Sequence, residues 1–428
     1  MKLNGAQILM KILLEENVDT IFGFPGGAVI DIYDELINTD IKHILVRHEQ
    51  GAVHAADGYA RASGKVGVCL VTSGPGATNT VTGIATAYMD SIPLVVITGQ
   101  VPTHLIGNDA FQEVDIVGIT RPCTKHNYLV KRTDDLAKII RQAFYIAKSG
   151  RPGPVFIDLP KDVANTTITY RDPGKVKMKS YRPHYEPNRK QLKKVIDLIK
   201  KARRPMIFAG GGAILSKSAP ALTAFARKLQ LPVTASLMGL GAFPGTDPLW
   251  LGMLGMHGTF RANMAVSNSD LLISLGVRFD DRVTGKIDTF APDAKIVHID
   301  IDPTSIRKNV PVSIPIVGDC RQALEAMLEL SEQNGFSDLT RERRPWLEQI
   351  DQWRQTRPLA YDQKEIIKPQ YVIEQLYELT GGEAIITTEV GQNQMWAAQY
   401  YHFDRPEHFI SSGGLGTMGF GPVSYTHL

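Results

Sequence analysis

Short apolar runs alternate with amphipathic segments over residues 1–165. Runs rich in Val and Ile predict strands, and segments with apolar residues at helical spacing predict helices between them. The predicted strands are Thr20–Phe24, Ile44–Val46, Gly67–Thr72, Pro93–Thr98 and Pro154–Asp158, and a helix is predicted near Ala77–Asp90. This alternation predicts an α/β domain built on a doubly wound parallel sheet.

The same rhythm resumes after residues 166–188, which lack apolar periodicity, contain three prolines and predict a linker. A second α/β domain is expected at residues 189–330. Its predicted elements are the helix Arg189–Lys201, the strand Pro205–Ala209, a turn at Gly210–Gly212, the helix Lys217–Leu229, strands near Val233, at Leu271–Leu275 and at Lys295–Asp300, and the helix Arg321–Leu330.

A third unit is expected at residues 369–421, after a helical linker at 331–368 that is rich in Glu, Arg, Gln and Pro. Its predicted elements are the helix Pro369–Leu379, the strand Ala384–Thr388, the helix Gln392–Tyr400 and the strand His408–Ser412. Two strands cannot cover both faces of a parallel sheet, so we expect this unit to be incomplete. The sequence of residues 422–428 shows no pattern of a helix or a strand, and we interpret these residues as a non-native tail.

Composition and charge exclude several functional classes. The chain has 47 Lys and Arg against 44 Asp and Glu, so its net charge of +3 gives no reason to expect nucleic acid as a partner. No apolar run is long enough to predict a membrane span. The cysteines Cys69, Cys123 and Cys320 are far apart, and we expect them to be packing residues of a cytoplasmic protein.

One carboxylate, Glu49, stands between the apolar run Ile44–Val46 and a segment rich in alanine. Such a place is poor for a solvated charge, so the carboxyl group must be paired, hold a proton or meet a ligand. Ion pairing with Arg47 or Arg61 is the structural alternative. The turn Ser73–Gly76 at a strand end could hold a polar ligand through its backbone N–H groups, or could be a plain connection.

The second domain carries weaker signals. The Gly210–Gly212 turn follows a strand but does not match the G-x-G-x-x-G dinucleotide fingerprint. Asp300 and Asp302 could take ribose hydroxyl groups, although Asp302 could instead cap a helix. Arg278 could face a ligand or pair with nearby aspartates. Because the chain contains no metallopeptidase, serine hydrolase or P-loop motif, we expect a bound organic cofactor to supply the chemistry.

Several motifs together resemble the acetolactate synthase (acetohydroxyacid synthase) large catalytic subunits, a family of thiamine-diphosphate enzymes. The resemblance covers nearly the whole chain. Its pieces are FGFPGGAVIDIYDEL, RHEQGAVHAADGYARASG, TSGPGATN, DAFQE, TRPCTKHN, SGRPGPVFIDLPKDV, GVRFDDRVTGK and GGLGTMGFG. DAFQE, PCTKHN and RFDDRVTGK favour this family over the pyruvate oxidases and decarboxylases that share its general plan.

The resemblance implies an activity and its cofactors. The reaction would be the decarboxylating condensation of two pyruvates to 2-acetolactate, or of pyruvate with 2-ketobutyrate to 2-aceto-2-hydroxybutyrate, the first common step of valine, leucine and isoleucine biosynthesis. Thiamine diphosphate, Mg²⁺ and a structural FAD would be bound by a homodimer or larger assembly, which a small regulatory subunit could join. An FAD-dependent pyruvate oxidase and a non-catalytic paralogue are the alternatives.

The resemblance also implies site residues. Glu49 would hydrogen-bond N1′ of the aminopyrimidine ring. The implied catalytic residues are Glu49, Gly26, Phe111, Gln112 and Lys161; the implied thiamine-diphosphate residues are Glu49, Pro25, Gly26, Val390, Gly391, Gln392, Asn393, Gly416 and Met418. The implied FAD residues are Arg151, Gly210, Gly211, Gly212, Thr259, Phe260, Gly276, Arg278, Asp280, Asp300, Asp302 and Asp319. Lys161 and Arg278 would hold the substrate carboxylate.

Two positions depart from the family pattern. Asn393 stands where the family more often has histidine. The family's Gly-Asp-Gly metal motif does not follow Gly421. We therefore expect the metal ligands to lie outside this chain, and we expect the chain alone to turn over little.

Overall fold

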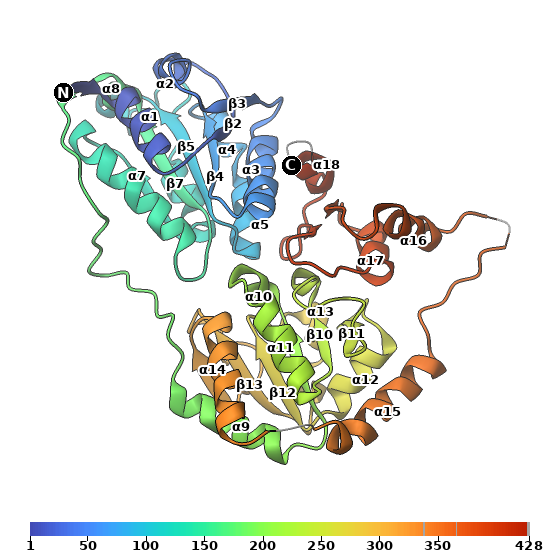
Figure 1. The fold of residues 1–428 in the computed structure, drawn as a ribbon. Coiled ribbons are helices and arrows are strands. Elements are labelled where there is room, and N and C mark those ends of the chain that lie inside the picture. Colours follow the sequence, from blue (N-terminus) through green and yellow to red (C-terminus); the bar gives the residue numbers. More distant parts are fainter. Residues whose placement is uncertain (337–338, 365, 426–428) are drawn as a thin grey trace. The chain divides into compact units, whose positions relative to one another are not determined.

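The computed structural model describes residues 1–336, 339–364 and 366–425 (Figure 1). Two compact units divide the chain. The first comprises Met1–Arg182 and the segment that starts at Ser412, and the second comprises Pro183–Ser411. Among the helices of the described residues, none is long and apolar enough to cross a membrane.

The first unit is built on a six-stranded parallel sheet with the order β3-β2-β4-β5-β7-β6. Its strands are β2 (Thr20–Phe24), β3 (Lys42–Leu45), β4 (Gly67–Val71), β5 (Leu94–Gln100), β6 (His126–Leu129) and β7 (Val155–Pro160). A short antiparallel pair joins β1 (Lys2–Asn4) to β8 (Thr167–Thr169).

Helices cover both faces of this sheet (Figure 1). They are α1 (Gly5–Glu15), α2 (Ile30–Leu36), α3 (Glu49–Ser63), α4 (Pro75–Thr78), α5 (Val81–Asp90), α6 (Ile116–Thr120), α7 (Thr133–Lys148) and α8 (Lys161–Asn165). Alternate residues of β4 enter different cores: Val68 and Leu70 pack with α1 and α7, whereas Cys69 and Val71 pack with α3 and α5. The predicted doubly wound parallel fold is confirmed.

Three details of the first unit differ from the sequence-based expectation. The strand expected at Ile44–Val46 is found as β3, but it lies at the sheet edge and Leu45 is 60% exposed, so it is not a buried strand. The helix expected near Ala77–Asp90 is split into α4 and α5. The strand β6 was not predicted, because its sequence HNYL carries little apolar signal.

The expectation of no helix after Gly421 is wrong. Residues Phe420–Tyr425 form α18, which packs on α3. Phe420 is fully buried, and a Cβ atom at Gly58 would lie 2.6 Å from the backbone oxygen of Ser424. The part of the expected tail at residues 426–428 lies outside the described residues.

The second unit contains a second six-stranded parallel sheet with the order β11-β10-β9-β12-β13-β14. Its strands are β9 (Pro205–Ala209), β10 (Val233–Ala235), β11 (Trp250–Met253), β12 (Leu271–Leu275), β13 (Lys295–Asp300) and β14 (Ile314–Val317). The flanking helices are α9 (Arg189–Lys201), α10 (Gly211–Leu215), α11 (Ala219–Leu229), α12 (Phe260–Asn268), α13 (Asp281–Thr284) and α14 (Cys320–Gln333). The first strand, β9, is central: β10 and β11 are added on one side of it, and β12, β13 and β14 on the other. This change of side between β9 and β12 is typical of dinucleotide-binding folds.

Further elements complete the second unit. They are α15 (Thr340–Thr356), α16 (Pro369–Thr380), α17 (Gln392–Tyr400), and the parallel pair β15 (Ile386–Thr387) and β16 (Phe409–Ile410). Helix α15 lies within the predicted linker and packs on the sheet domain. Its Trp346 is buried and donates a hydrogen bond to the carbonyl of Pro205 at 3.2 Å, and its buried Arg343 donates to the carbonyl of Ile199 at 2.7 Å.

Candidate functional site

Three loops of the first unit meet at the carboxyl edge of its sheet. Gly26 follows β2, Glu49 follows β3 as the first residue of α3, and Thr72 follows β4. The next strand after β2, β3, is added on one side of β2, and β4 is added on the other side. The order of the strands therefore changes direction between β2 and β4. Ligands of open α/β sheets bind at such a switch point.

Glu49 is buried at this switch point, with 8% of its surface exposed. The side-chain amide of Asn79 donates a hydrogen bond to Glu49 Oε2 at 2.9 Å. The alternative of ion pairing with Arg61 is wrong, because Arg61 pairs with Asp57 and Asp90, and Arg47 is exposed to solvent. A neutral amide therefore orients the carboxyl group.

Two glycines bring backbone close to Glu49. A Cβ atom at Gly26 would lie 2.6 Å from Thr72 Oγ1, and one at Gly76 would lie 2.7 Å from Thr72 Cγ2 and 3.4 Å from Glu49 Oε1. Thr72 Oγ1 is buried and has no hydrogen-bond partner in the described part of the chain. A buried hydroxyl without a partner is costly, so this place suits a polar ligand.

The structure brings two of the expected substrate residues to the same loops. Lys161, the first residue of α8, donates a hydrogen bond from Nζ to the carbonyl of Gly27 at 3.1 Å. Gln112 has a left-handed backbone (φ 58°) and packs against Gly74, whose Cβ would lie 2.7 Å from the Gln112 carbonyl oxygen. The neighbouring Phe111 is 87% exposed. These side chains stand at the loops that surround Glu49.

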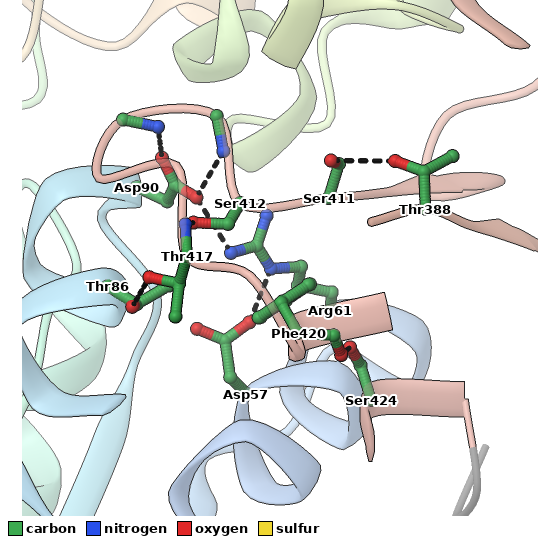
Figure 2. Close-up of polar contacts among 12 residues, drawn as sticks. Asp57, Arg61, Thr86, Asp90, Thr388, Ser411, Ser412, Thr417, Phe420 and Ser424 are labelled. Atoms are coloured by element: carbon green, nitrogen blue, oxygen red, sulfur yellow. Dashed lines mark hydrogen bonds and ion pairs between the residues drawn. The ribbon is translucent and has the colours of Figure 1, made fainter. Parts of the chain in front are cut away.

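The glycine-rich segment after β16 belongs to the first unit as well. Gly413 and Gly414 donate their backbone N–H groups to the carboxylate of Asp90, and the Thr417 hydroxyl lies 2.7 Å from that of Thr86 (Figure 2). Gly416 has a left-handed backbone (φ 73°), and Met418 is 78% exposed. Two of the implied thiamine residues thus lie on an anchored loop.

Of the other implied thiamine residues, Val390 and Gly391 lie between β15 and α17 in the second unit, and Gln392 and Asn393 are the first residues of α17. Gly391 caps α17 with a φ of 137°, and its Cβ would have no atom within 4 Å among the described residues, apart from its chain neighbours. Gln392 and Asn393 are exposed. On either side of the turn Val390–Asn393, Thr388 and Gln394 donate hydrogen bonds to the hydroxyl of Ser411, at 2.8 Å and 2.5 Å. These two hydrogen bonds fix the ends of the turn, while the backbone at Gly391 faces open space.

The glycines of the central sheet allow two turns to touch at its switch point. A Cβ at Gly210 would lie 2.3 Å from the carbonyl oxygen of Gly276, and one at Gly212 would lie 2.6 Å from Gly276 Cα. Gly211 is less constrained, because its Cβ would lie 3.2 Å from Met238 Cβ. Gly210, Gly212 and Gly276 are therefore required by backbone packing, whatever the turns bind.

The implied FAD aspartates have local roles. Asp280 caps α13 and Asp319 caps α14, each accepting a backbone N–H. Asp300 Oδ1 accepts a hydrogen bond from the backbone N–H of Asp302. The carboxylate of Asp302 in turn accepts hydrogen bonds from the backbone N–H and the hydroxyl of Thr304. Asp302 thus caps a turn and not the helix that the following proline suggested. The Arg278 guanidinium lies 3.9 Å from Asp280, the pairing that was left open.

The remaining implied FAD residues lie apart from these turns in the chain. Thr259 caps α12 by accepting the N–H of Ala262. Phe260 lies under the Arg357 guanidinium, 5.0 Å from the ring centre, and lines a cavity of 220 Å³. Arg151 belongs to the first unit, where its Nε donates to the Ser91 hydroxyl at 2.8 Å.

Three families of thiamine pyrophosphate enzyme domains match the chain. The N-terminal TPP binding domain matches residues 3–119, the central domain matches residues 192–327, and the C-terminal TPP binding domain matches residues 389–424. These matches cover β2–β5 of the first sheet, the whole central sheet and most of the glycine-rich segment that ends in α18.

Full-length relatives agree with these matches. The chain is 53% identical over 424 residues to the acetolactate synthase large subunit of Haemophilus influenzae, covering 98% of this chain and 74% of that protein. It is 55% identical over 423 residues to the acetolactate synthase isozyme 3 large subunit of Escherichia coli, with the same coverage. It is 50% identical over 425 residues to the acetolactate synthase of Mycobacterium leprae, covering 98% of this chain and 67% of that protein. The chain belongs to the acetolactate synthase family.

Two polar residues of this acetolactate synthase family member were missed as site residues by sequence reasoning. Asn79 was noticed only as part of a helix start, and Thr72 only as the end of a strand. Both belong to the run TSGPGATN, from Thr72 to Asn79, and the break between α4 and α5 turns the Asn79 amide toward Glu49. The motif was the signal in the sequence, but the sequence does not show how the motif folds.

The expectation of Mg²⁺ stays a prediction. Across residues 1–336, 339–364 and 366–425, no group of three or more His, Cys, Asp or Glu side chains could hold a metal ion.

Proposed function

We propose that this member of the acetolactate synthase family catalyses the decarboxylating condensation of two pyruvates to 2-acetolactate, or of pyruvate with 2-ketobutyrate to 2-aceto-2-hydroxybutyrate. The observation that carries the proposal is the buried Glu49 carboxyl group at the sheet switch point. One of its oxygens is fixed by Asn79 and the other faces Gly76. The names of the relatives support the same activity.

The residues at this point fit the aminopyrimidine ring of thiamine diphosphate. A flat ring needs close backbone approach, which Gly26 and Gly76 provide, and polar partners, which Glu49 and the unpaired Thr72 hydroxyl provide. Pro25 would flank it. As the resemblance implies, the turn Val390–Asn393 and the loop of Gly416 and Met418 would hold the rest of the cofactor from a second copy of the chain. When bound, thiamine diphosphate supplies the electron sink that allows a 2-keto acid to lose CO₂.

The chain's own residues hold and move one proton in this scheme. Because Asn79 donates to Glu49 Oε2, that oxygen accepts, and Oε1 is the atom free to share a proton with a ring nitrogen. Glu49 is buried, and a hydrogen bond to a buried carboxyl group is stronger than one in water. A carboxyl group placed for one defined proton transfer is the typical device of general acid–base catalysis.

Lys161 is placed to bind the substrate. Its ammonium group lies beside the loop of Gly27, and charge-assisted hydrogen bonds to a carboxylate are strong. Gln112 and the exposed Phe111 would close over the keto acid from the neighbouring loop. Arg278 remains a proposed second contact to a substrate carboxylate.

We further propose that the central sheet binds FAD as a structural cofactor. The turns after β9 and β12 meet at the switch point, which is where dinucleotides bind in this strand order. A cavity of 220 Å³, lined in part by Thr259 and Phe260, could take another part of the cofactor. No step of the proposed reaction uses the flavin.

Partners and location are also proposals. Two of these relatives are named large subunits, which supports a smaller regulatory subunit as partner. An assembly of at least two copies is proposed from the resemblance, in which the glutamate and the diphosphate-binding residues come from different subunits. The three cysteines are free, which supports a reducing, cytoplasmic environment.

The test is Glu49→Gln in the protein as its gene encodes it, assembled with thiamine diphosphate, Mg²⁺ and FAD. We expect acetolactate formation under nitrogen to fall by about 10²–10⁴-fold, because glutamine cannot share the proton. Glu35→Gln is the matched control, since Glu35 also accepts a hydrogen bond from a side-chain amide, that of Gln7 at 3.0 Å. Full activity of Glu49→Gln, or product formation only with O₂, would favour another reaction.

A further inference from the structure

Three charged side chains lie buried between α3 and α5. Arg61 Nε is 2.6 Å from Asp57 Oδ1, and Arg61 Nη2 is 3.0 Å from Asp90 Oδ2 (Figure 2). The arginine side chain is 7% exposed and both aspartate side chains are 0% exposed. One cation thus faces two carboxylates in a place without solvent, and the surplus negative charge needs other partners.

Asp90 has those partners and Asp57 lacks them. Gly413 donates its N–H to Asp90 Oδ2 at 3.0 Å, and Gly414 donates to Oδ1 at 2.7 Å. Asp57 Oδ2 is buried without a hydrogen-bond partner among the described residues. Burial raises the pKa of Asp57, against the lowering effect of Arg61. Asp90, with hydrogen bonds to both of its oxygens, is therefore the carboxylate that holds the glycine loop.

The loop is anchored at its other end as well. The Thr417 N–H donates to the Ser412 hydroxyl at 2.9 Å, and the Thr417 hydroxyl lies 2.7 Å from that of Thr86. The buried Phe420 ring lies 5.3 Å from the Arg61 guanidinium. Between these anchors Met418 stays 78% exposed, although it is apolar. The anchors hold the backbone and leave that side chain free to meet a ligand.

We propose that Asp90 is a positioning residue, which fixes the Gly413–Gly419 loop and thereby Met418 for the thiamine site. The inference rests on the proposed function. Asp90 touches neither cofactor nor substrate in this scheme and acts only through the two glycine N–H groups. Arg61 Nη2 holds the Asp90 carboxylate in place, and the contact of Arg61 Nε with Asp57 fixes the arginine side chain.

The test is hydrogen–deuterium exchange of the peptide spanning residues 412–421 in the cofactor-free protein. In Asp90→Asn the carboxamide carries no charge and presents only one acceptor oxygen to the two N–H groups. We expect exchange of the glycine amides to rise about tenfold or more, since hydrogen bonds to charged groups are the strong ones. We also expect a weaker apparent affinity for thiamine diphosphate, with kcat at saturating cofactor nearly unchanged.

Asp247→Asn is the matched control. Asp247 is also buried, pairs with Arg227 Nε at 2.7 Å and accepts the N–H of Leu249 at 2.9 Å, but it lies in the second unit. It should leave exchange of residues 412–421 unchanged. Unchanged exchange in Asp90→Asn, or an equal rise in the control, would overturn the proposal.

A second variant covers the case in which Asp90→Asn does not fold. Arg61→Lys keeps a cation but loses the fork that reaches both carboxylates. A rise in exchange concentrated in residues 412–421 supports the positioning role, and a rise spread evenly over α3 and α5 overturns it. Hydrogen exchange is measured without cofactor, so its result does not depend on the result of the Glu49→Gln assay. A failure of the positioning role of Asp90 can therefore be told apart from a failure of the proposed function.

Discussion

A buried acid on β7, Asp158, should make the stability of the first unit fall as the pH rises. Its side chain is 2% exposed. Thr98 donates to Oδ1 and Gln100 donates to Oδ2, both at 2.9 Å. Burial raises the pKa of Asp158 to about 7, although these hydrogen bonds lower it, and the charge of Asp115 adds to the rise. We therefore examine Asp158→Asn, whose side chain has the shape of the protonated acid.

The sign of the effect follows from proton binding. Between the ordinary pKa of 3.8 and the folded pKa of about 7, the folded protein keeps a proton that the unfolded chain has lost. The folded state binds more protons there, so stability is highest at low pH and declines until the pH passes about 7. A pKa raised from 3.8 to about 7 corresponds to a total decline of about 4 kcal/mol.

The asparagine variant should lack this decline. We expect the free energy of unfolding of Asp158→Asn, minus that of the parent protein, to increase from about pH 5 to about pH 7 by about 1.4 kcal/mol per pH unit and then to level off. Denaturant titrations followed by circular dichroism at several pH values measure it, provided that the m-values agree. Asp40→Asn, at an exposed carboxylate, is the control and should give a flat difference. A flat or decreasing difference for Asp158→Asn would refute the reasoning.

Two further predictions concern packing and thiol chemistry. Gly212→Ala should destabilise the second unit by about 1–3 kcal/mol, because the added methyl group would lie 2.6 Å from Gly276 Cα. It should also reduce flavin absorbance of the purified protein, whereas Gly211→Ala should be milder; equal effects would contradict this. Burial raises the pKa of all three thiols, so a thiol reagent should label the native protein slowly and reach the half-buried Cys123 first. Rapid labelling of all three cysteines would show that these cores open readily.

The main elements of both sheets were predictable from the sequence. The helix α9 and the strands β9, β12 and β13 have the predicted bounds, because continuous apolar runs and strong helical periodicity mark them. The strands β11 and β14 were missed. Their sequences WLGM and IPIV are short and interrupted by glycine or proline, so local signal is weak and pairing with neighbours creates the strand.

The candidate site was only half predictable. Motifs pointed to Glu49 and Gly26, but the partner of Glu49 could not be read from spacing. Arg61 is close in sequence, yet the helix carries it away to Asp57 and Asp90, and the amide of Asn79 arrives from a loop 30 positions later. The helix α18 was missed because Pro422 suggests a break, although proline is tolerated in a first helical turn.

The packing of the glycine-rich segment on α3 and α5 has a consequence for how the chain folds. Thr86 and Thr417 are 331 positions apart, and the contacts of Gly413 and Gly414 with Asp90 span 323 and 324. Contacts of such separation form late, because a long loop must close before they stabilise anything. During synthesis the alanine-rich face of α3 and the charges of Asp57 and Asp90 must therefore wait for the last part of the described chain. We expect the first unit to be completed late in the synthesis of the protein, although most of its residues lie at the start of the described chain.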